Sequence, residues 1–401
     1  MRQVETLIED YCVIYFGNDW AAENRTSSHH IATRLKARVP VLYVDSPGLR
    51  APQATGRDFK KIFRKISQAV ARPVSIGDLG WRCTIPQLPF RKMPGVNFLN
   101  QVFAKFAVKR ALRLAGLAQR PRILWFVVPH PGFLIGHLDE RYVVYYCIDD
   151  YAAHPGMEKD RVAKMDLDLT LAADRVFVAP PSLLQAKLDV NKSTKFSPHG
   201  VDLELFGSVN SESVKVHESL ANLKKPVIGF FGLVADWIDT SLIEEIALRF
   251  PDSTVLLVGH QSTDISRLTK LPNVLFAGPK PYKELPRWAK AFDVAIIPYR
   301  LNQQVKNANP LKLREYLATG IPIVAVTNPE IEKFAHVMYI AKDTEDFIAG
   351  IKHVLATDSA EQRSLRMKSV SEMSWDKRVN ETIDIVNQDL KTMSTAVAPQ
   401  R

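Results

Sequence analysis

The sequence predicts an α/β protein made of two doubly wound domains, and three observations support that prediction. The chain of 401 residues is too long for one hydrophobic core, because domains usually hold about 100–200 residues. Short apolar segments alternate with helix-like segments in both halves, which is typical of buried parallel strands joined by helices. A polar, helix-poor stretch at 209–225 separates the two series. Ligands of such folds bind at the carboxyl ends of the strands, so we expect both domains to face a central cleft.

The first domain is predicted to span 1–205. Its first strand precedes a turn at 17–20 and a helix at 22–36, and apolar runs mark the strands that follow. The strands of this domain are predicted at 11–16, 39–44, 123–128, 143–147 and 176–179.

A linker at 206–225 and a second domain at 226–370 are predicted next. The helices of the second domain include 242–250 and 282–292, and its strands are again short apolar runs. They are predicted at 227–231, 254–258, 274–277, 294–298 and 323–326. The polar segment 371–401 is predicted to be a C-terminal helix that crosses back to the first domain.

Composition argues against several kinds of site. Cys12, Cys83 and Cys147 are far apart and fit no zinc or redox spacing, so we expect buried thiols and no metal. No apolar run reaches the roughly 18–20 residues that cross a bilayer, and the N-terminus carries acidic residues where a signal peptide is basic. We therefore expect a cytoplasmic protein.

The segment 309–324, NPLKLREYLATGIPIV, carries the most informative pair of charges. Lys312 and Glu315 lie three residues apart near the start of a helix that Gly320 and Pro322 end. An ammonium there neutralises a diphosphate beside free backbone N–H groups, and a carboxylate accepts hydrogen bonds from ribose hydroxyls. An exposed ion pair on an ordinary helix is the alternative.

Positive charge is concentrated in one part of the first domain. The net charge is +10, and residues 51–130 hold fifteen Lys or Arg against two acids. The segments 59–70 and 98–117 look like basic amphipathic helices, with Lys60, Lys61, Arg64 and Lys65 in the first of them. An anionic membrane surface is the favoured partner; simple solvated charge and nucleic acid are the alternatives, and no nucleic-acid recognition motif is present.

Several motifs together resemble one enzyme family. They are Pro198-His199-Gly200-Val201-Asp202, the strand-to-turn segment 230–234, the strand ends Val258-Gly259 and Pro298-Tyr299, and the helix at 311–319. On these motifs the chain resembles the GT-B glycosyltransferases, which have two Rossmann-like domains that face a central cleft. Nearest in pattern are the bacterial exopolysaccharide and teichuronic-acid types, related to the xanthan glucuronosyltransferase.

The resemblance implies a set of donor-binding residues. Gly232 and the turn to Asp236 match the backbone near the donor phosphates, Lys312 matches the diphosphate-binding lysine, and Glu315 matches the ribose position. Lys280 matches a loop near the base, and Tyr299 a strand end near the donor. Leu311, at the start of the same helix as Lys312, is also a candidate for donor binding. Each of these residues also has a structural interpretation, such as a turn glycine or a half-buried aromatic.

One position departs from the family. Retaining members carry a glutamate eight positions before the Glu315 equivalent, and Asn307 stands there in this chain. The amides of Asn307 and Asn309 are therefore candidates for contact with the donor sugar, and both retention and inversion stay open.

The acceptor side is expected in the first domain. Asp149 resembles the general base of the inverting xanthan-type enzyme; its neighbour Asp150 is the alternative base, and a helix N-cap is the structural alternative. Asp19 and His30, in the segment after the first strand, are candidates for a second acid/base. Arg25 from that segment is a candidate for the acceptor or membrane side, together with the basic residues of 59–70.

The resemblance implies a metal-independent, hexosyltransferase-like enzyme without a cofactor. It is expected to move a sugar from a nucleotide-diphosphate sugar, favouring UDP, to a hydroxyl of a lipid-linked or polysaccharide acceptor at the inner face of the cell membrane. A nucleotide-sugar epimerase of the same shape and a noncatalytic sugar-binding scaffold are the alternatives.

Overall fold

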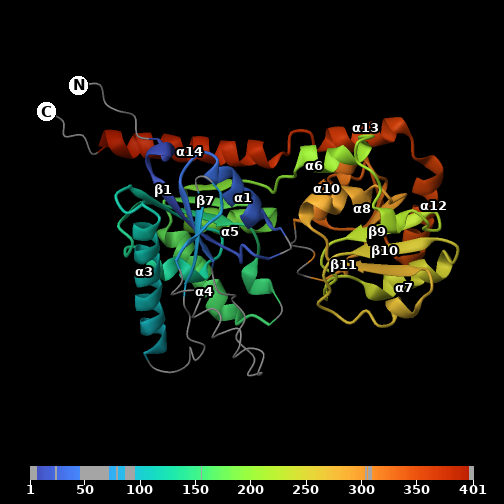
Figure 1. Cartoon of the computed structure of the whole chain (residues 1–401), viewed down its shortest axis with the longest axis horizontal. Coiled ribbons are helices and arrows are strands. Elements are labelled where there is room, and N and C mark those ends of the chain that lie inside the picture. Colours follow the sequence, from blue (N-terminus) through green and yellow to red (C-terminus); the bar gives the residue numbers. More distant parts are fainter. Residues whose placement is uncertain are drawn as a thin grey trace. The chain divides into compact units, whose positions relative to one another are not determined.

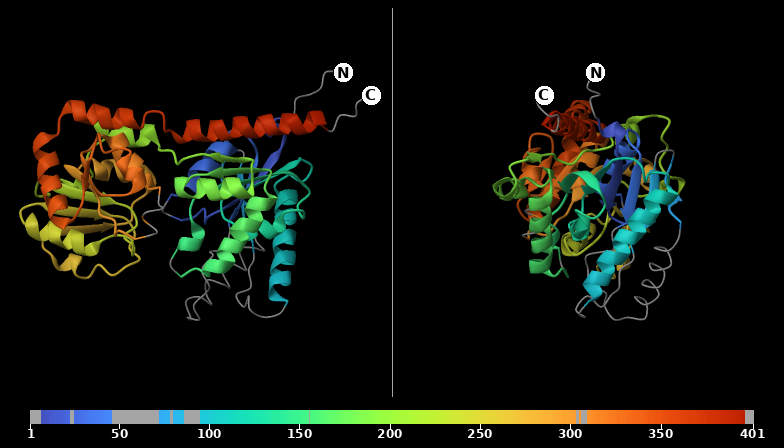
Figure 2. Two further views of the ribbon diagram at one scale, coloured as in Figure 1. Left: turned by 180° about the vertical axis from the view of Figure 1, so that it is seen from behind. Right: turned by 90° about the vertical axis from the view of Figure 1, so that its left-hand side faces the viewer.

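The computed structural model describes residues 7–22, 25–45, 72–77, 80–85, 95–154, 156–302, 305 and 309–396. The chain divides into two compact units: Met1–Pro198 with Arg378–Arg401, and His199–Lys377. Each unit is an α/β domain with a mainly parallel sheet (Figures 1 and 2). The predicted fold class, two Rossmann-like doubly wound domains, is confirmed. The basic segment 59–70 lies outside the described residues, and so does Asn307.

The sheet of the first unit has, among the described residues, eight strands in the order β3-β4-β2-β1-β5-β6-β7-β8. All neighbours are parallel except β3 and β4. The strands are β1 (Cys12–Gly17), β2 (Val41–Asp45), β3 (Val74–Ser75), β4 (Gly80–Thr84), β5 (Arg122–Phe126), β6 (Glu140–Cys147), β7 (Arg175–Val178) and β8 (Thr194–Phe196). The chain leaves β1 toward β2 and later returns to its other side with β5. Loops at the carboxyl ends of β1 and β5 therefore flank a topological switch point, where ligands bind in such sheets.

Helices cover this sheet and pack apolar side chains against it. The main ones are α1 (Ser27–Lys36), α3 (Val96–Leu114), α4 (Lys159–Ala172), α5 (Pro181–Val190) and the part of α14 (Trp375–Ala396) from Arg378 onward. Figure 1 shows α3 at one side of this unit. The strands of the core are almost wholly apolar and buried, as expected for parallel strands covered on both faces.

The C-terminal helix is held on the first unit by a set of polar bonds and an apolar face. Val379, Ile383, Val386 and Leu390 are buried at helical spacing. Arg175 donates two hydrogen bonds to Asp389, at 2.6 and 2.8 Å. Such a bidentate pair fixes orientation as well as position.

The second unit has a sheet of six described strands in the order β11-β10-β9-β12-β13-β14, all parallel. The strands are β9 (Val227–Phe231), β10 (Thr254–Val258), β11 (Val274–Gly278), β12 (Val294–Ile297), β13 (Ile323–Val326) and β14 (Tyr339–Ala341). Its helices are α6 (Leu203–Gly207), α7 (Thr240–Arg249), α8 (Leu285–Ala289), α10 (Leu311–Thr319), α11 (Pro329–Glu332), α12 (Thr344–Thr357) and α13 (Ala360–Ser369). Figure 1 shows α7 on one face of the sheet and α6 and α10 on the other. The topological switch point lies between β9 and β12.

The segment 206–225, predicted as a linker, belongs to the second unit. Phe206, Val209 and Leu220 are buried in the apolar core of that unit. The low helical periodicity of the segment concealed this, because α6 and two short 3₁₀ turns bury single residues rather than a repeating stripe. The second unit also extends past 370, to Lys377.

Gly200, in the motif 198–202, marks a close approach of two chain segments within the second unit. A Cβ at this position would lie 2.8 Å from both the backbone N and the Cα of Trp375. Real side chains do not pack that closely against backbone, so glycine allows the segment before α14 to pass here. The motif therefore has a structural role at this position.

Candidate active site

Lys312 lies directly over Gly232 in the second unit. A Cβ on Gly232, whose φ is +140°, would fall 1.6 Å from Cε of Lys312 and 2.3 Å from its Nζ. Only glycine therefore leaves room for this lysine at the carboxyl end of β9. The amine lies 5.9 Å from the centre of the Phe230 ring, and it makes no hydrogen bond or ion pair with any residue that the structure describes.

Glu315 lies one turn further along α10 and shares this environment. Its Oε1 accepts a hydrogen bond from the hydroxyl of Tyr282 at 3.3 Å. Burial raises the pKa of Glu315 to about 7, and the Lys312 ammonium partly offsets this shift. Burial likewise lowers the pKa of the Lys312 amine, with Glu315 opposing. Both charged forms are thus poorly solvated without a ligand, which suits a site that takes phosphate and hydroxyl groups.

The start of α10 adds backbone donors to this site. The N-cap is Pro310, and no side chain caps the helix. The N–H groups of a first helical turn lack intrahelical partners and attract anions. Leu311, predicted as a donor contact, is the first residue of this turn and is half-buried.

The other residues that were predicted to bind the sugar donor differ in exposure and in their contacts. Tyr299 is buried, and burial together with nearby Glu315 raises its pKa. Asp236 is exposed in the segment between β9 and α7. Nζ of Lys280 lies 4.4 Å from the centre of the Trp288 ring. Buried Asn309 accepts a hydrogen bond from Arg314 at 2.5 Å, so its carbonyl oxygen supports the start of α10.

Asp149 follows the carboxyl end of β6 in the first unit, and its side chain is 47% exposed. Its Oδ2 lies 2.9 Å from Nε2 of His154, and its Oδ1 accepts a hydrogen bond from the backbone N–H of Asp150 at 2.8 Å. The carboxylate of Asp150 instead caps the 3₁₀ turn Tyr151–Ala153, accepting from the N–H of Ala153 at 3.3 Å. The capping role weighed for Asp149 thus falls to its neighbour.

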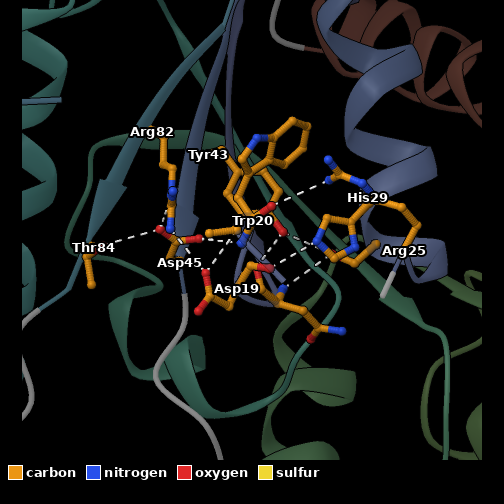
Figure 3. A network of polar contacts seen from close by, with 11 residues as sticks. Asp19, Trp20, Arg25, His29, Tyr43, Asp45, Arg82 and Thr84 are labelled. Atoms are coloured by element: carbon orange, nitrogen blue, oxygen red, sulfur yellow. Dashed lines mark hydrogen bonds and ion pairs between the residues drawn. The ribbon is translucent and has the colours of Figure 1, made fainter. Parts of the chain in front are cut away.

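Two more predicted residues, Asp19 and Arg25, lie in the segment between β1 and α1 (Figure 3), and His30 lies within α1. The Asp19 side chain is exposed and accepts a hydrogen bond from Arg82 at 3.1 Å. The guanidinium of Arg25 lies 5.3 Å from the centre of the Trp20 ring. His30 is 6% exposed within α1, and the neighbouring His29 contacts the segment through its Nε2, which lies 3.0 Å from the carbonyl oxygen of Asp19.

Sequence reasoning did not single out Tyr282, Asp202 or His154. Tyr282 follows β11, and Asp202 belongs to a recognised motif and raises the pKa of Glu315. The 3₁₀ turn Tyr151–Ala153 lies between Asp149 and His154, which caps its C-terminal end. No group of three His, Cys, Asp or Glu side chains in the described part of the chain is arranged to hold a metal ion.

Comparisons with known proteins bear on the enzyme class. Residues 225–357 match the family model "Glycosyl transferases group 1". A Bacillus subtilis (strain 168) relative named as a teichuronic acid biosynthesis glycosyltransferase, TuaH, is 29% identical over 350 residues, covering 81% of this chain and 84% of its own.

Solved structures share the fold at low identity. Anabaena HepE in complex with UDP and glucose superposes with a TM-score of 0.61 at 13% identity, over 93% of this chain and 99% of its own. The E. coli trehalose-6-phosphate structure bound with UDP-2-fluoro glucose gives a TM-score of 0.62 at 13% identity, over 95% and 99%. The two Rossmann-like units therefore have the GT-B fold, and residues 225–357 of the second unit match a glycosyltransferase family.

Proposed function

We propose that this glycosyltransferase moves a sugar from a UDP-sugar to a hydroxyl of a lipid-linked saccharide in cell-surface polysaccharide biosynthesis. The observation that carries the proposal is the Lys312 amine, held over Gly232 beside Glu315 without a hydrogen-bonding partner among the described residues. The relative named for teichuronic acid biosynthesis supports the pathway class, and the UDP in the HepE structure supports the donor.

The chemistry of transfer assigns a task to each group. The acceptor oxygen bonds to the anomeric carbon of the donor sugar while the bond from that carbon to the diphosphate oxygen breaks. Asp149 takes the acceptor proton, and His154 holds its carboxylate in place. Lys312 and the first N–H groups of α10 stabilise the negative charge that develops on the leaving UDP. The buried hydroxyl of Tyr151, which has no hydrogen-bond partner among the described residues, offers a donor beside Asp149.

A thermal-shift screen of nucleotides and nucleotide sugars tests the donor assignment. UDP and UDP-sugars are expected to raise the Tm more than the adenine and guanine counterparts, because ligands that bind the native state stabilise it. Glu315 accepts hydrogen bonds from both ribose hydroxyls best when it is ionised, and burial raises its pKa to about 7. Affinity for UDP is therefore expected to fall by up to about tenfold per pH unit below 7. Equal shifts for all nucleotides, or none, would reject the UDP assignment.

The exposed face of α3 supports a membrane-associated acceptor. Its apolar side chains, which we call the α3 apolar face, are Phe98, Leu99, Val102, Phe103 and Phe106. They recur at one-turn spacing, and Phe98 and Phe106 are 67% and 66% exposed. Lys105 and Arg113 are exposed on the same helix. Aromatic side chains beside cations are typical of helices that lie on anionic lipid, and no described helix is long and apolar enough to span the bilayer.

Vesicle sedimentation tests this membrane contact. The full chain is expected to bind vesicles of phosphatidylglycerol and phosphatidylcholine, and to bind less as salt rises. Phe98→Ser with Phe106→Ser is expected to weaken binding at least about tenfold, because each buried phenylalanine contributes about 1.5–3 kcal/mol. Leu248→Ser with Leu365→Ser, at exposed leucines of the second unit, is the matched control. Equal sedimentation of both double variants would contradict the assignment of α3.

A further inference from the structure

The loop that follows β1 is unusually constrained for an exposed segment. We call Asn18, Asp19 and Trp20 the β1 loop. The hydroxyl of Tyr43 donates to the carbonyl of Asn18 at 2.6 Å, and the N–H of Asn18 donates to Oγ of Ser28 at 3.3 Å. Strand β2 and helix α1 thus hold the first residue of the loop from two sides. Asp19 and Trp20 remain on the surface, exposed and partly exposed respectively.

The imidazole of His29 holds the middle of the β1 loop, and its hydrogen bonds define its tautomer. The backbone N–H of Thr26 lies 3.1 Å from Nδ1 of His29, and because an N–H only donates, Nδ1 accepts. The ring proton is therefore on Nε2, which donates to the carbonyl of Asp19 at 3.0 Å. Burial lowers the pKa of His29 to about 4, so the ring is neutral at pH 7 and this bond persists.

A buried carboxylate holds the end of the β1 loop (Figure 3). Asp45, at the end of β2, is 4% exposed. Its Oδ1 accepts from the N–H of Trp20 at 2.8 Å, and its Oδ2 accepts from Nε of Arg82 and, at 3.2 Å, from Oγ1 of Thr84. Nη2 of Arg82 in turn donates to the carboxylate of Asp19 at 3.1 Å. One guanidinium therefore connects the buried acid to the exposed one.

A buried network of charged groups contributes little net stability to the fold. Burying a charge costs several kcal/mol, and a buried ion pair is often no more stabilising than apolar residues of similar volume. Burial raises the pKa of Asp45 despite its donors, which is the sign of that cost. What the network does supply is position: the carboxylate of Asp19 and the indole of Trp20 are fixed in advance of any ligand.

We propose that Asp45 and Arg82 are positioning residues that preform the β1 loop as a saccharide-binding subsite for the acceptor. The loop offers what a sugar ring requires: an indole for its C–H face and a carboxylate for its hydroxyls. Its place at the switch point of the first sheet is where ligands of this fold bind. The proposal rests on the proposed function, because it takes the acceptor to be a saccharide.

Saccharide binding by the full chain tests the proposal. The probes are octyl glycosides of common hexoses, N-acetylhexosamines and uronic acids, below their micelle concentrations, with Kd measured by saturation-transfer NMR. Trp20→Ala and Arg82→Ala are each expected to weaken binding about tenfold, because the first removes the indole contact and the second releases the loop that presents the binding groups. Arg82→Ala added to Trp20→Ala is expected to cost less than about twofold more, since Arg82 acts through the loop. Arg82→Lys is expected to behave like Arg82→Ala, because an ammonium does not reproduce the fork between two carboxylates.

Controls separate this role from a structural one and from the proposed function. Arg38→Ala, at a partly exposed arginine of the same unit, is expected to leave saccharide binding unchanged. UDP affinity is expected to stay the same in all these variants, since its site lies in the second unit. A lower Tm of Arg82→Ala together with an unchanged Kd for the saccharide would overturn the positioning role. So would wild-type protein that binds UDP but none of the probes, whereas absence of UDP binding would instead reject the proposed function.

Discussion

Replacement of Lys312 by alanine is expected to weaken UDP binding by about 10- to 100-fold, because a hydrogen bond to a charged partner contributes about 1.5–3 kcal/mol. The amine is held over Gly232 by the geometry of the backbone, and burial already lowers its pKa in the free protein. The negative charge of a bound diphosphate compensates the Lys312 ammonium for the water that burial removes. Isothermal titration of both proteins with UDP at pH 8 measures the effect.

Two further variants make this test specific. Lys352→Ala, at an exposed lysine on α12, is the matched control and is expected to keep wild-type affinity. Gly232→Ala keeps the amine but adds a Cβ where Cε of Lys312 lies, so it is expected to lose a similar part of the binding energy by displacing the side chain. Unchanged UDP affinity in Lys312→Ala would remove the phosphate site from this position.

The sequence was sufficient for the central strands of both sheets and for the helical spacing of the pair on α10, but it did not predict the outer strands β3, β4, β8 and β14. Parallel strands that are buried on both faces have continuous apolar sequences. The bounds of β9, β10 and β12 were therefore predicted to within a residue or two. Helical spacing placed Lys312 and Glu315 on adjacent turns of one face. Both features depend only on residues that are close in the sequence, so a short sequence pattern is enough to predict them.

Contacts between distant segments were not predictable in the same way. Arg82 lies within β4, 37 residues beyond its partner Asp45, and only the register of β2 against β4 brings the two together. Asn309 was predicted as a candidate for contact with the donor sugar, but its bond from Arg314 was not predictable. Pairings of this kind depend on strand order and loop path, which carry no periodic signal along the chain.

Replacement of Asp149 by asparagine is expected to lower turnover by about 10²- to 10⁴-fold, the usual contribution of a general base. An amide has almost the same shape as a carboxylate and still accepts from the N–H of Asp150, but it does not take up a proton. UDP affinity is expected to be unchanged, because Lys312 and Glu315 lie in the other unit. Release of UDP from the donor, measured with a lipid-linked saccharide fraction as acceptor, gives the rate.

The adjacent carboxylate supplies the control for this experiment. Asp150 caps the turn Tyr151–Ala153, and asparagine is as good a capping residue as aspartate, so Asp150→Asn is expected to retain most of the turnover and of the stability. His154→Leu removes the group that holds the Asp149 carboxylate, and it is expected to slow turnover in the wild-type background but not in Asp149→Asn. The reverse pattern, with activity lost in Asp150→Asn and kept in Asp149→Asn, would transfer the base to Asp150 and leave the imidazole contact without a catalytic role.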